Sequence, residues 1–141
     1  MRLYMAGPLF TLAEKEFNAS LAAWLRDHGH DVFLPQENEQ GGNAFAIFQS
    51  DEEGIEQADA IVACMDGTDP DSGTCWEVGY AYARGKKILL YRTDMRYETP
   101  HGPYNLMLHQ SAHVVLDCSQ LKDCMRVADR IDAALKWDEI K

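Results

Sequence analysis

The stretch "AIVACMDGTDPDSGTCWEVGYAYARGKKILLYR", residues 60–92, decides the fold. It begins with a continuous apolar run over residues 60–65, passes through a polar turn, and ends in a second apolar run over residues 87–92. Continuous apolar runs of this length are typical of strands covered on both faces, as in parallel sheets. The small and aromatic residues between them predict a helix over residues 74–85. We therefore predict a strand–helix–strand unit with parallel strands.

The same alternation continues on both sides of this stretch. Three more continuous apolar runs are expected to form strands, at residues 2–6, 31–35 and 113–117. Three helical patterns accompany them, at residues 11–29, 46–58 and 119–135. The first of these opens with Thr11 and Glu14, which have the spacing of a capping box. Five buried strands alternating with helices predict one domain over residues 1–141, a flavodoxin-like or Rossmann-like doubly wound α/β fold with a five-stranded parallel sheet flanked by helices.

The charge balance limits the partners of this protein. Its 141 residues are 46% hydrophobic, which is enough for one core, and carry 13 Lys and Arg against 23 Asp and Glu, a net charge of -10. Such a chain repels a polyanion such as DNA, RNA or an acidic membrane surface at long range. We therefore expect a small-molecule ligand, and neither a nucleic acid polymer nor a membrane as partner.

The cysteines and the first residues indicate where the protein works. The four cysteines form no C-x-x-C pair and lie mostly inside apolar segments, which suits a reducing compartment. No spacing of Cys, His or carboxylates resembles a zinc or iron site, so we predict no metal and no cofactor. The first residues lack the pattern of a signal peptide and no stretch reaches the length of a membrane span, so we expect a cytoplasmic protein.

The first predicted strand runs into "YMAGPLF", residues 4–10, at the sheet edge where doubly wound proteins bind ligands. Gly7 and the proline after it force a sharp turn, and Leu9 and Phe10 present apolar surface beside it. An aromatic ligand would stack on such a surface. Composition alone favours the alternative, a hydrophobic staple in which Leu9 or Phe10 packs on the next helix. Tyr4 lies inside the strand, where a buried hydroxyl needs a partner.

Three aspartates share the loop before the third predicted helix. Asp66, Asp69 and Asp71 fall in "DGTDPDSGT", ahead of a helix N-terminus whose free N–H groups attract negative charge. Solvated turn positions explain Asp66 and Asp69. Asp71 is different, because the turn that contains Gly73 would bring it back toward the start of the helix. Asp59 lies just ahead of the preceding strand, where an aspartate is usually a turn residue.

Glu77 is the residue that the helical pattern explains least. It falls within the first two turns of the third helix, among apolar and aromatic residues that indicate a largely buried segment. A carboxylate held ionised in such a place is a candidate nucleophile. The alternative is a surface glutamate paired with Arg84 or Lys86, and the residues alone leave both interpretations open. A second carboxyl group nearby, from Asp71 or Asp59, would favour the chemical interpretation.

A short apolar segment near the C-terminal third contains a single amide. It is "PYNLML", residues 103–108, and the amide is that of Asn105. The segment is either the start of a helix that Asn105 caps or a contact surface.

Three of these motifs together resemble those of the nucleoside 2-deoxyribosyltransferases. They are "YMAGPLF", "DSGTCWEVGYAYARGK" and "PYNLML", in this order and spacing, and the resemblance covers nearly the whole chain. The middle motif is the most specific, because it has the pattern D-x-G-x-x-x-E-x-G at a strand–helix junction. Enzymes of this family move a 2-deoxyribosyl group from one nucleobase to another through a covalent glycosyl-enzyme. The resemblance therefore implies a transferase of nucleoside salvage that acts on nucleosides and free nucleobases.

The resemblance also implies catalytic roles for four residues. Glu77 matches the nucleophile of a retaining double displacement. Asp71 and Asp59 match acids that contact the base and help its protonation. Tyr4 matches a tyrosine whose hydroxyl orients the nucleophile.

Further positions are expected to bind the substrate, namely Gly7, Leu9, Phe10, Gly73 and Asn105. Leu9 and Phe10 would form the wall of the base pocket. Asn105 matches a residue that reaches the sugar bound by the neighbouring subunit, so the resemblance implies a homo-oligomer, at least a dimer. A side-chain amide in residues 36–40 is expected to bind the base, and Gln36 and Gln40 are both candidates. No motif assigns a role to the final "KWDEIK". The motifs do not distinguish a preference for purine bases from one for pyrimidine bases.

Two alternative functions are also compatible with the sequence. An N-glycoside hydrolase of 2'-deoxynucleosides or their 5'-monophosphates would use water as the acceptor. The monophosphate form needs a phosphate site, and the net charge of -10 argues against it. A non-catalytic nucleoside-binding module would use Glu77 only to bind a sugar hydroxyl.

Overall fold

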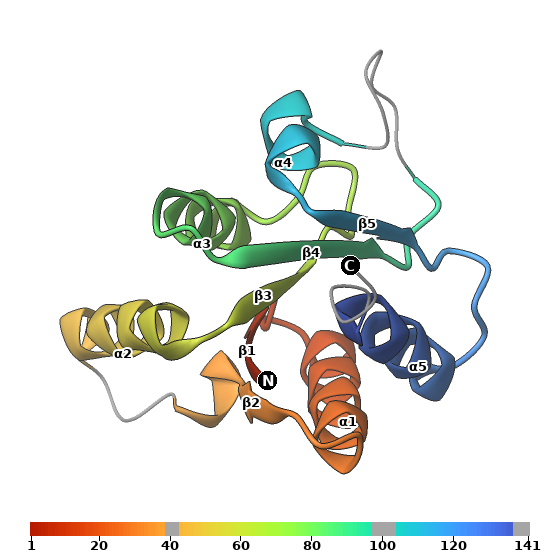
Figure 1. Cartoon of the computed structure of the whole chain (residues 1–141), viewed down its shortest axis with the longest axis horizontal. Coiled ribbons are helices and arrows are strands. Elements are labelled where there is room, and N and C mark those ends of the chain that lie inside the picture. The colour runs from red at the N-terminus through yellow and green to blue at the C-terminus, as the bar shows by residue number, and fades with distance from the viewer. Residues whose placement is uncertain (39–42, 97–103, 137–141) are drawn as a thin grey trace.

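Five parallel strands form the centre of the molecule. The computed structural model describes residues 1–38, 43–96 and 104–136 (Figure 1). The strands are β1 (Arg2–Ala6), β2 (Asp31–Phe33), β3 (Ala60–Cys64), β4 (Lys87–Arg92) and β5 (Val114–Asp117). They pair in the order β2-β1-β3-β4-β5, and every pair is parallel. This is the flavodoxin-like order, so the predicted fold class is confirmed.

Helices cover both faces of this sheet. They are α1 (Leu12–Asp27), α2 (Ala44–Gln57), α3 (Ser72–Ala83), α4 (Leu106–Ser111) and α5 (Cys124–Leu135), and a 3-10 helix, η1 (Pro35–Glu37), follows β2. α1 and α5 lie on one face, and α2, α3 and α4 lie on the other (Figure 1). Side chains of a strand alternate between faces. Leu3 and Met5 of β1 therefore enter the core under α1 and α5, whereas Tyr4 enters the core under α2 and α3.

The element boundaries differ from the sequence prediction in three main places. β2 is shorter than predicted, because Pro35 has no N–H for a strand ladder and begins η1 instead. α5 begins later than predicted, because the Asp123 carboxylate accepts a hydrogen bond from Arg126 N at 2.9 Å and caps the helix there. α4 is a helix of six residues with Asn105 as its N-cap, so the segment around Asn105 is a helix start.

Local capping of α1 follows the sequence prediction. Thr11 N donates to Glu14 Oε1 at 2.8 Å, and Glu14 N donates to Thr11 Oγ1 at 3.1 Å, which completes the predicted capping box. The four cysteines are free thiols. In the described ranges, every helix is too short or too polar to cross a membrane.

A glycine lets α2 approach the sheet closely beside β1. A Cβ at Gly54 would lie 3.0 Å from two atoms of the Phe33 ring. Phe33 in turn stacks on Tyr4, with ring centroids 5.3 Å apart and an interplanar angle of 13°. The Phe33 ring is thus confined between α2 and Tyr4, and this packing fixes the position of the Tyr4 ring on the sheet.

We expect Gly54→Ala to destabilise the protein. Alanine favours a helix interior by about 1 kcal/mol over glycine, but overpacking against the confined Phe33 ring costs about 1–3 kcal/mol. A net loss of about 1 kcal/mol in the free energy of unfolding should appear in urea titrations. Gly79→Ala in α3 is the matched control, because a Cβ there meets no described atom within 4 Å. Equal stabilisation by both substitutions would show that the close approach of α2 does not need Gly54.

Candidate active site

The sheet order places a ligand-binding edge between β1 and β3. The chain leaves β1 through α1 and enters β2 on one side, and β3 lies on the other side of β1. Doubly wound proteins bind ligands at such a topological switch point, at the carboxyl ends of the strands. α2 and α3 both pack on the face of the sheet that carries Tyr4. Glu77 lies on α3 and Asp71 is its N-cap, so the fold directs both residues to this region.

Glu77 and Tyr4 form the centre of the site. Tyr4 is fully buried, and Glu77 is half-buried with its Oε2 atom shielded from solvent. Among the described residues, neither Glu77 Oε2 nor Tyr4 Oη has a hydrogen-bond partner of regular geometry. The two groups nevertheless shift each other's pKa, because they are close neighbours. The structure thus brings these two predicted residues together.

The surroundings of Glu77 favour its neutral form more than water does. Burial raises the pKa of Glu77 to about 7. The Tyr4 hydroxyl opposes this rise, because a hydrogen-bond donor favours a carboxylate, while the negative charges of Asp51 and Asp71 add to it. Burial, together with Glu77 and Asp51, raises the pKa of Tyr4 well above its usual value. At neutral pH a protonated Tyr4 therefore faces a carboxyl group that is close to half-ionised.

The two cations considered as partners of Glu77 are bound elsewhere. Arg84 Nε lies 2.6 Å from Glu56 Oε1, and Lys86 Nζ donates to Glu56 O at 2.6 Å. Both side chains therefore tie α3 and the turn after it to α2. The interpretation of Glu77 as a surface glutamate paired with either cation is wrong.

Asp51 is a site residue that sequence reasoning missed. It lies on α2, and its negative charge raises the pKa of both Tyr4 and Glu77. The acidic stretch around Asp51 is typical of a solvated helix face, so the sequence does not mark Asp51 as a site residue. Gly54 is the signal that could have revealed Asp51, because a glycine inside a helix indicates close packing and residues three apart share a helix face.

Asp71 caps α3 and turns back toward the helix start, as the turn predicts. Its Oδ2 atom accepts hydrogen bonds from Thr74 N and from Thr74 Oγ1, each at 3.0 Å. A Cβ at Gly73 would lie 3.3 Å from Asp71 Oδ2, so the glycine leaves room for the carboxylate. The charge of Asp71 raises the pKa of Glu77, which makes Asp71 a second carboxylate of the site.

Asp59 lies away from these residues. It immediately precedes β3, and its carboxylate accepts a hydrogen bond from Arg2 N at 2.7 Å, at the start of β1. A residue ahead of a parallel strand lies at the amino edge of the sheet, opposite to the ligand-binding edge. The structure does not bring Asp59 together with Glu77, and we remove Asp59 from the candidate site.

The turn after β1 lies at the same edge as the site. Gly7 allows β1 to leave the sheet close to β3, since a Cβ there would lie 3.1 Å from Cys64 Cβ. Leu9 is half-buried and lines a small recess together with Gly7 and Gln36. Phe10 is 72% exposed, so it does not pack as a staple on α1. Its ring is an apolar surface open to a ligand.

The Gln36 amide is bonded at both ends. Its Nε2 atom donates to Lys15 O at 2.9 Å, and its Oε1 atom accepts from Asn18 Nδ2 at 3.2 Å. Asn18 also donates to Pro8 O at 2.9 Å. These amides tie η1 and the turn after β1 to α1. Gln40, the other open candidate, lies outside the described residues.

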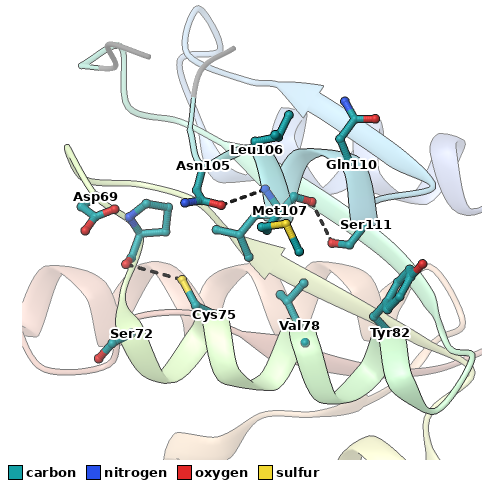
Figure 2. A pocket seen from close by; sticks show the side chains of 13 residues that line it. Asp69, Ser72, Cys75, Val78, Tyr82, Asn105, Leu106, Met107, Gln110 and Ser111 are labelled. Atoms are coloured by element: carbon teal, nitrogen blue, oxygen red, sulfur yellow. Dashed lines mark hydrogen bonds between the residues drawn. The ribbon is translucent and has the colours of Figure 1, made fainter. Parts of the chain in front are cut away.

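Asn105 lines a groove between α3 and α4. Its Oδ1 atom accepts a hydrogen bond from Met107 N at 2.8 Å and caps α4. The groove has a volume of about 630 Å³, and Figure 2 shows Val78 on its α3 wall and Met107 on its α4 wall. Glu77 is not among the described residues that line it. Residues 137–141 of the final "KWDEIK" lie outside the described residues.

The assembled groups are suited to nucleophilic or acid–base chemistry. Glu77 is a carboxyl group near half-ionisation, Asp51 and Asp71 are carboxyl groups beside it, and Tyr4 supplies a hydroxyl. Strongly shifted pKa values at a ligand-binding edge are typical of functional sites. Within the described parts of the chain, no three or more His, Cys, Asp or Glu side chains are grouped so that they could hold a metal ion.

Comparison with known sequences identifies the family. The family described as nucleoside 2-deoxyribosyltransferase matches residues 3–107. An uncharacterized protein of Ureaplasma parvum serovar 3 is 34% identical over 116 residues, which cover 68% of this chain and 72% of the relative.

Solved structures agree with this match. The structure is similar to that of a 2-deoxyribosyltransferase from Bacillus psychrosaccharolyticus, at 30% identity and a TM-score of 0.71, with 92% of this chain and 91% of the other covered. It is also similar to a 2-deoxyribosyltransferase from Leishmania mexicana, at 27% identity and a TM-score of 0.68, with 81% and 89% covered. The chain therefore belongs to the nucleoside 2-deoxyribosyltransferase family.

Proposed function

We propose that this protein transfers a 2-deoxyribosyl group between nucleobases, with Glu77 as the nucleophile. The observation that carries the proposal is the half-buried Glu77 carboxyl group, which faces the buried Tyr4 hydroxyl and has a pKa of about 7. Membership of the family supports the substrate class, because the family acts on nucleosides and nucleobases.

The reaction proceeds by two displacements at the anomeric carbon. In the first, the ionised Glu77 carboxylate forms a bond to the anomeric carbon as the bond to the base breaks, and the departing base takes up a proton. In the second, a different base attacks the same carbon, loses a proton, and releases Glu77 as a carboxylate. The two inversions retain the β configuration of the nucleoside.

Five other side chains support these steps. The Tyr4 hydroxyl holds the carboxylate of Glu77 in position, since it stabilises the ionised form. One of the two nearby carboxyl groups, Asp51 or Asp71, in its protonated form gives a proton to the departing base and takes a proton back from the incoming base. Leu9 and Phe10 offer the apolar wall on which a base stacks.

Substitution of the nucleophile tests the mechanism directly. We expect Glu77→Gln to reduce the exchange of bases on a 2'-deoxynucleoside by at least about 1000-fold, because glutamine cannot form the ester intermediate. When the wild-type reaction with substrate is quenched, mass spectrometry should detect a peptide that contains Glu77 and is heavier by one deoxyribosyl unit. Glu53→Gln, at an exposed position of α2, is the control and should retain near-normal rates.

The same assay separates the other functions. Near-normal exchange by Glu77→Gln would disprove the nucleophile assignment. Release of free base without exchange in the wild type would favour an N-glycoside hydrolase. Tight nucleoside binding without turnover would favour a binding module.

The pKa of Glu77 predicts the pH dependence. Because the carboxylate is the reactive form, kcat/KM should rise with pH up to about 7, the pKa of Glu77, and level off above it. Tyr4→Phe removes the group that lowers the pKa of Glu77, so the acid limb of the profile should move to higher pH. A limb that stays in place, or moves to lower pH, would contradict the role of Tyr4.

We infer that the protein acts as a homo-oligomer, at least a dimer, in which Asn105 serves the site of a neighbouring chain. The groove beside Asn105 is lined largely by apolar residues of α3 and α4. Leu106, Met107 and Tyr82 are exposed at this surface, by 46%, 77% and 61%. Contiguous exposed apolar surface of this kind is typical of a protein interface, and the family resemblance supports Asn105 as the residue that crosses it.

Complementation tests the shared site. Glu77→Gln and Asn105→Ala proteins should each be nearly inactive. After mixing and subunit exchange, a dimer of one chain of each kind has one site with both Glu77 and Asn105 intact. A 1:1 mixture should therefore regain about a quarter of wild-type activity. No recovery, with exchange of chains verified by native mass spectrometry, would show that each chain carries a complete site.

A further inference from the structure

A buried arginine joins two loops beside the candidate site. Arg92 is the last residue of β4 and is 3% exposed. Its guanidinium donates from Nη1 to Met65 O at 2.6 Å and from Nη2 to Gly67 O at 2.8 Å, both in the loop between β3 and α3. Its Nε donates to Asp94 O at 2.9 Å, and Nη2 also contacts Arg96 O, both in the loop that follows β4. One side chain thus links the backbones of two separate loops.

Two aspartates complete this link in the opposite direction. Asp66 Oδ1 accepts from Thr93 N at 2.6 Å and from Asp94 N at 2.9 Å, and Asp66 Oδ2 accepts from Thr93 Oγ1. Asp94 Oδ2 accepts from Gly67 N at 3.1 Å. Asp66 is therefore not the solvated turn residue that the sequence favours. Each loop donates to and accepts from the other, and Arg92 lies at the centre of the joint.

The loop held by Arg92 is the one that carries Asp71. It leaves β3 at Met65, where the guanidinium binds it, and ends at Asp71, whose carboxylate caps α3 and raises the pKa of Glu77. Between these points, Asp69 and Pro70 line the groove that contains Asn105. A shift of the loop would therefore move both the carboxylate beside Glu77 and one wall of this groove.

We propose that Arg92 is a positioning residue, which sets the place of Asp71 and of the start of α3 through the loop between β3 and α3. The inference rests on the proposed function for its catalytic consequence. Arginine suits this role because its planar fork presents donors to several carbonyl groups at once, whereas lysine has one nitrogen. The guanidinium nitrogens of Arg92 all donate to backbone carbonyl groups of the two loops, so Arg92 acts on the site through the loop.

The test is Arg92→Lys, which retains the charge but loses the fork. We expect kcat/KM for base exchange to fall by about 10-fold to 100-fold, because a displacement of catalytic groups of about 1 Å has effects of this size. The rates are divided by the fraction of protein that forms the glycosyl-enzyme. A variant that merely contains less folded protein therefore gives the same normalised rate as the wild type. Arg126→Lys, at an exposed arginine of α5 that pairs with Asp123, is the matched control and should stay within about twofold.

Hydrogen exchange locates the effect independently of activity. Amides of residues 66–74 should exchange faster in Arg92→Lys than in the wild type, whereas those of α5 should not change. Thr93→Val, which removes only the hydroxyl bound to Asp66, should give a smaller change of the same kind in both exchange and kcat/KM. Normal kcat/KM with a loosened loop, or lower kcat/KM with an unchanged loop, would overturn the proposal.

A failure of the proposed function gives a different pattern. If the wild type does not exchange bases, that function is wrong, and binding of a 2'-deoxynucleoside is measured by calorimetry on both proteins instead. Weaker binding by Arg92→Lys together with faster loop exchange supports the positioning role. Unchanged binding overturns it.

Discussion

The burial of a Glu77 carboxylate oxygen against the Tyr4 hydroxyl is the interaction on which the rest of the structure depends. A buried polar atom without a regular hydrogen bond costs about 1–3 kcal/mol, and this pair contains two such atoms among the described residues. The surrounding packing offsets the cost, because Tyr4 stacks on Phe33 and α2 closes over that ring. A fold that maintains such a penalty is typical of a site of function rather than of a structural core.

The sheet order explains how three carboxyl groups come to one place. α2 and α3 cover the same face of the sheet, so Asp51 on one helix and Glu77 on the other face the same part of β1. Asp71 joins them as the N-cap of α3. Each carboxyl group is carried by a rigid element with its own buried contacts, so like charges stay close although they repel. Burial raises the pKa of Glu77 to about 7, and the repulsion from Asp51 and Asp71 adds to this rise.

Most of the fold could be predicted from the sequence, because continuous apolar strands and capping residues are local signals. Within the site, Tyr4, Asp71 and Glu77 come together as their motifs predict. Asp51 is missed, because its acidic neighbours are typical of a solvated helix face, and only Gly54 signals the packing of α2 against the sheet. The resemblance implies a catalytic role for Asp59, whereas its place ahead of β3 puts it at the opposite edge of the sheet. Local patterns thus specify the elements, whereas the partners of a side chain follow from tertiary packing.

In the turn after β1, the backbone is held in place, but the side chain of Phe10 makes little contact with the rest of the protein. Thr11 fixes the backbone through the capping box of α1, whereas the adjacent Phe10 is 72% exposed. Exchange of such an exposed side chain usually changes the free energy of unfolding by less than about 0.5 kcal/mol. A substitution at position 10 therefore needs no compensating substitution that stabilises the fold, and the three carboxyl groups keep their geometry. Under the proposed function, exchange of the side chain at position 10 alters the apolar surface offered to a base and leaves the packing of the core unchanged.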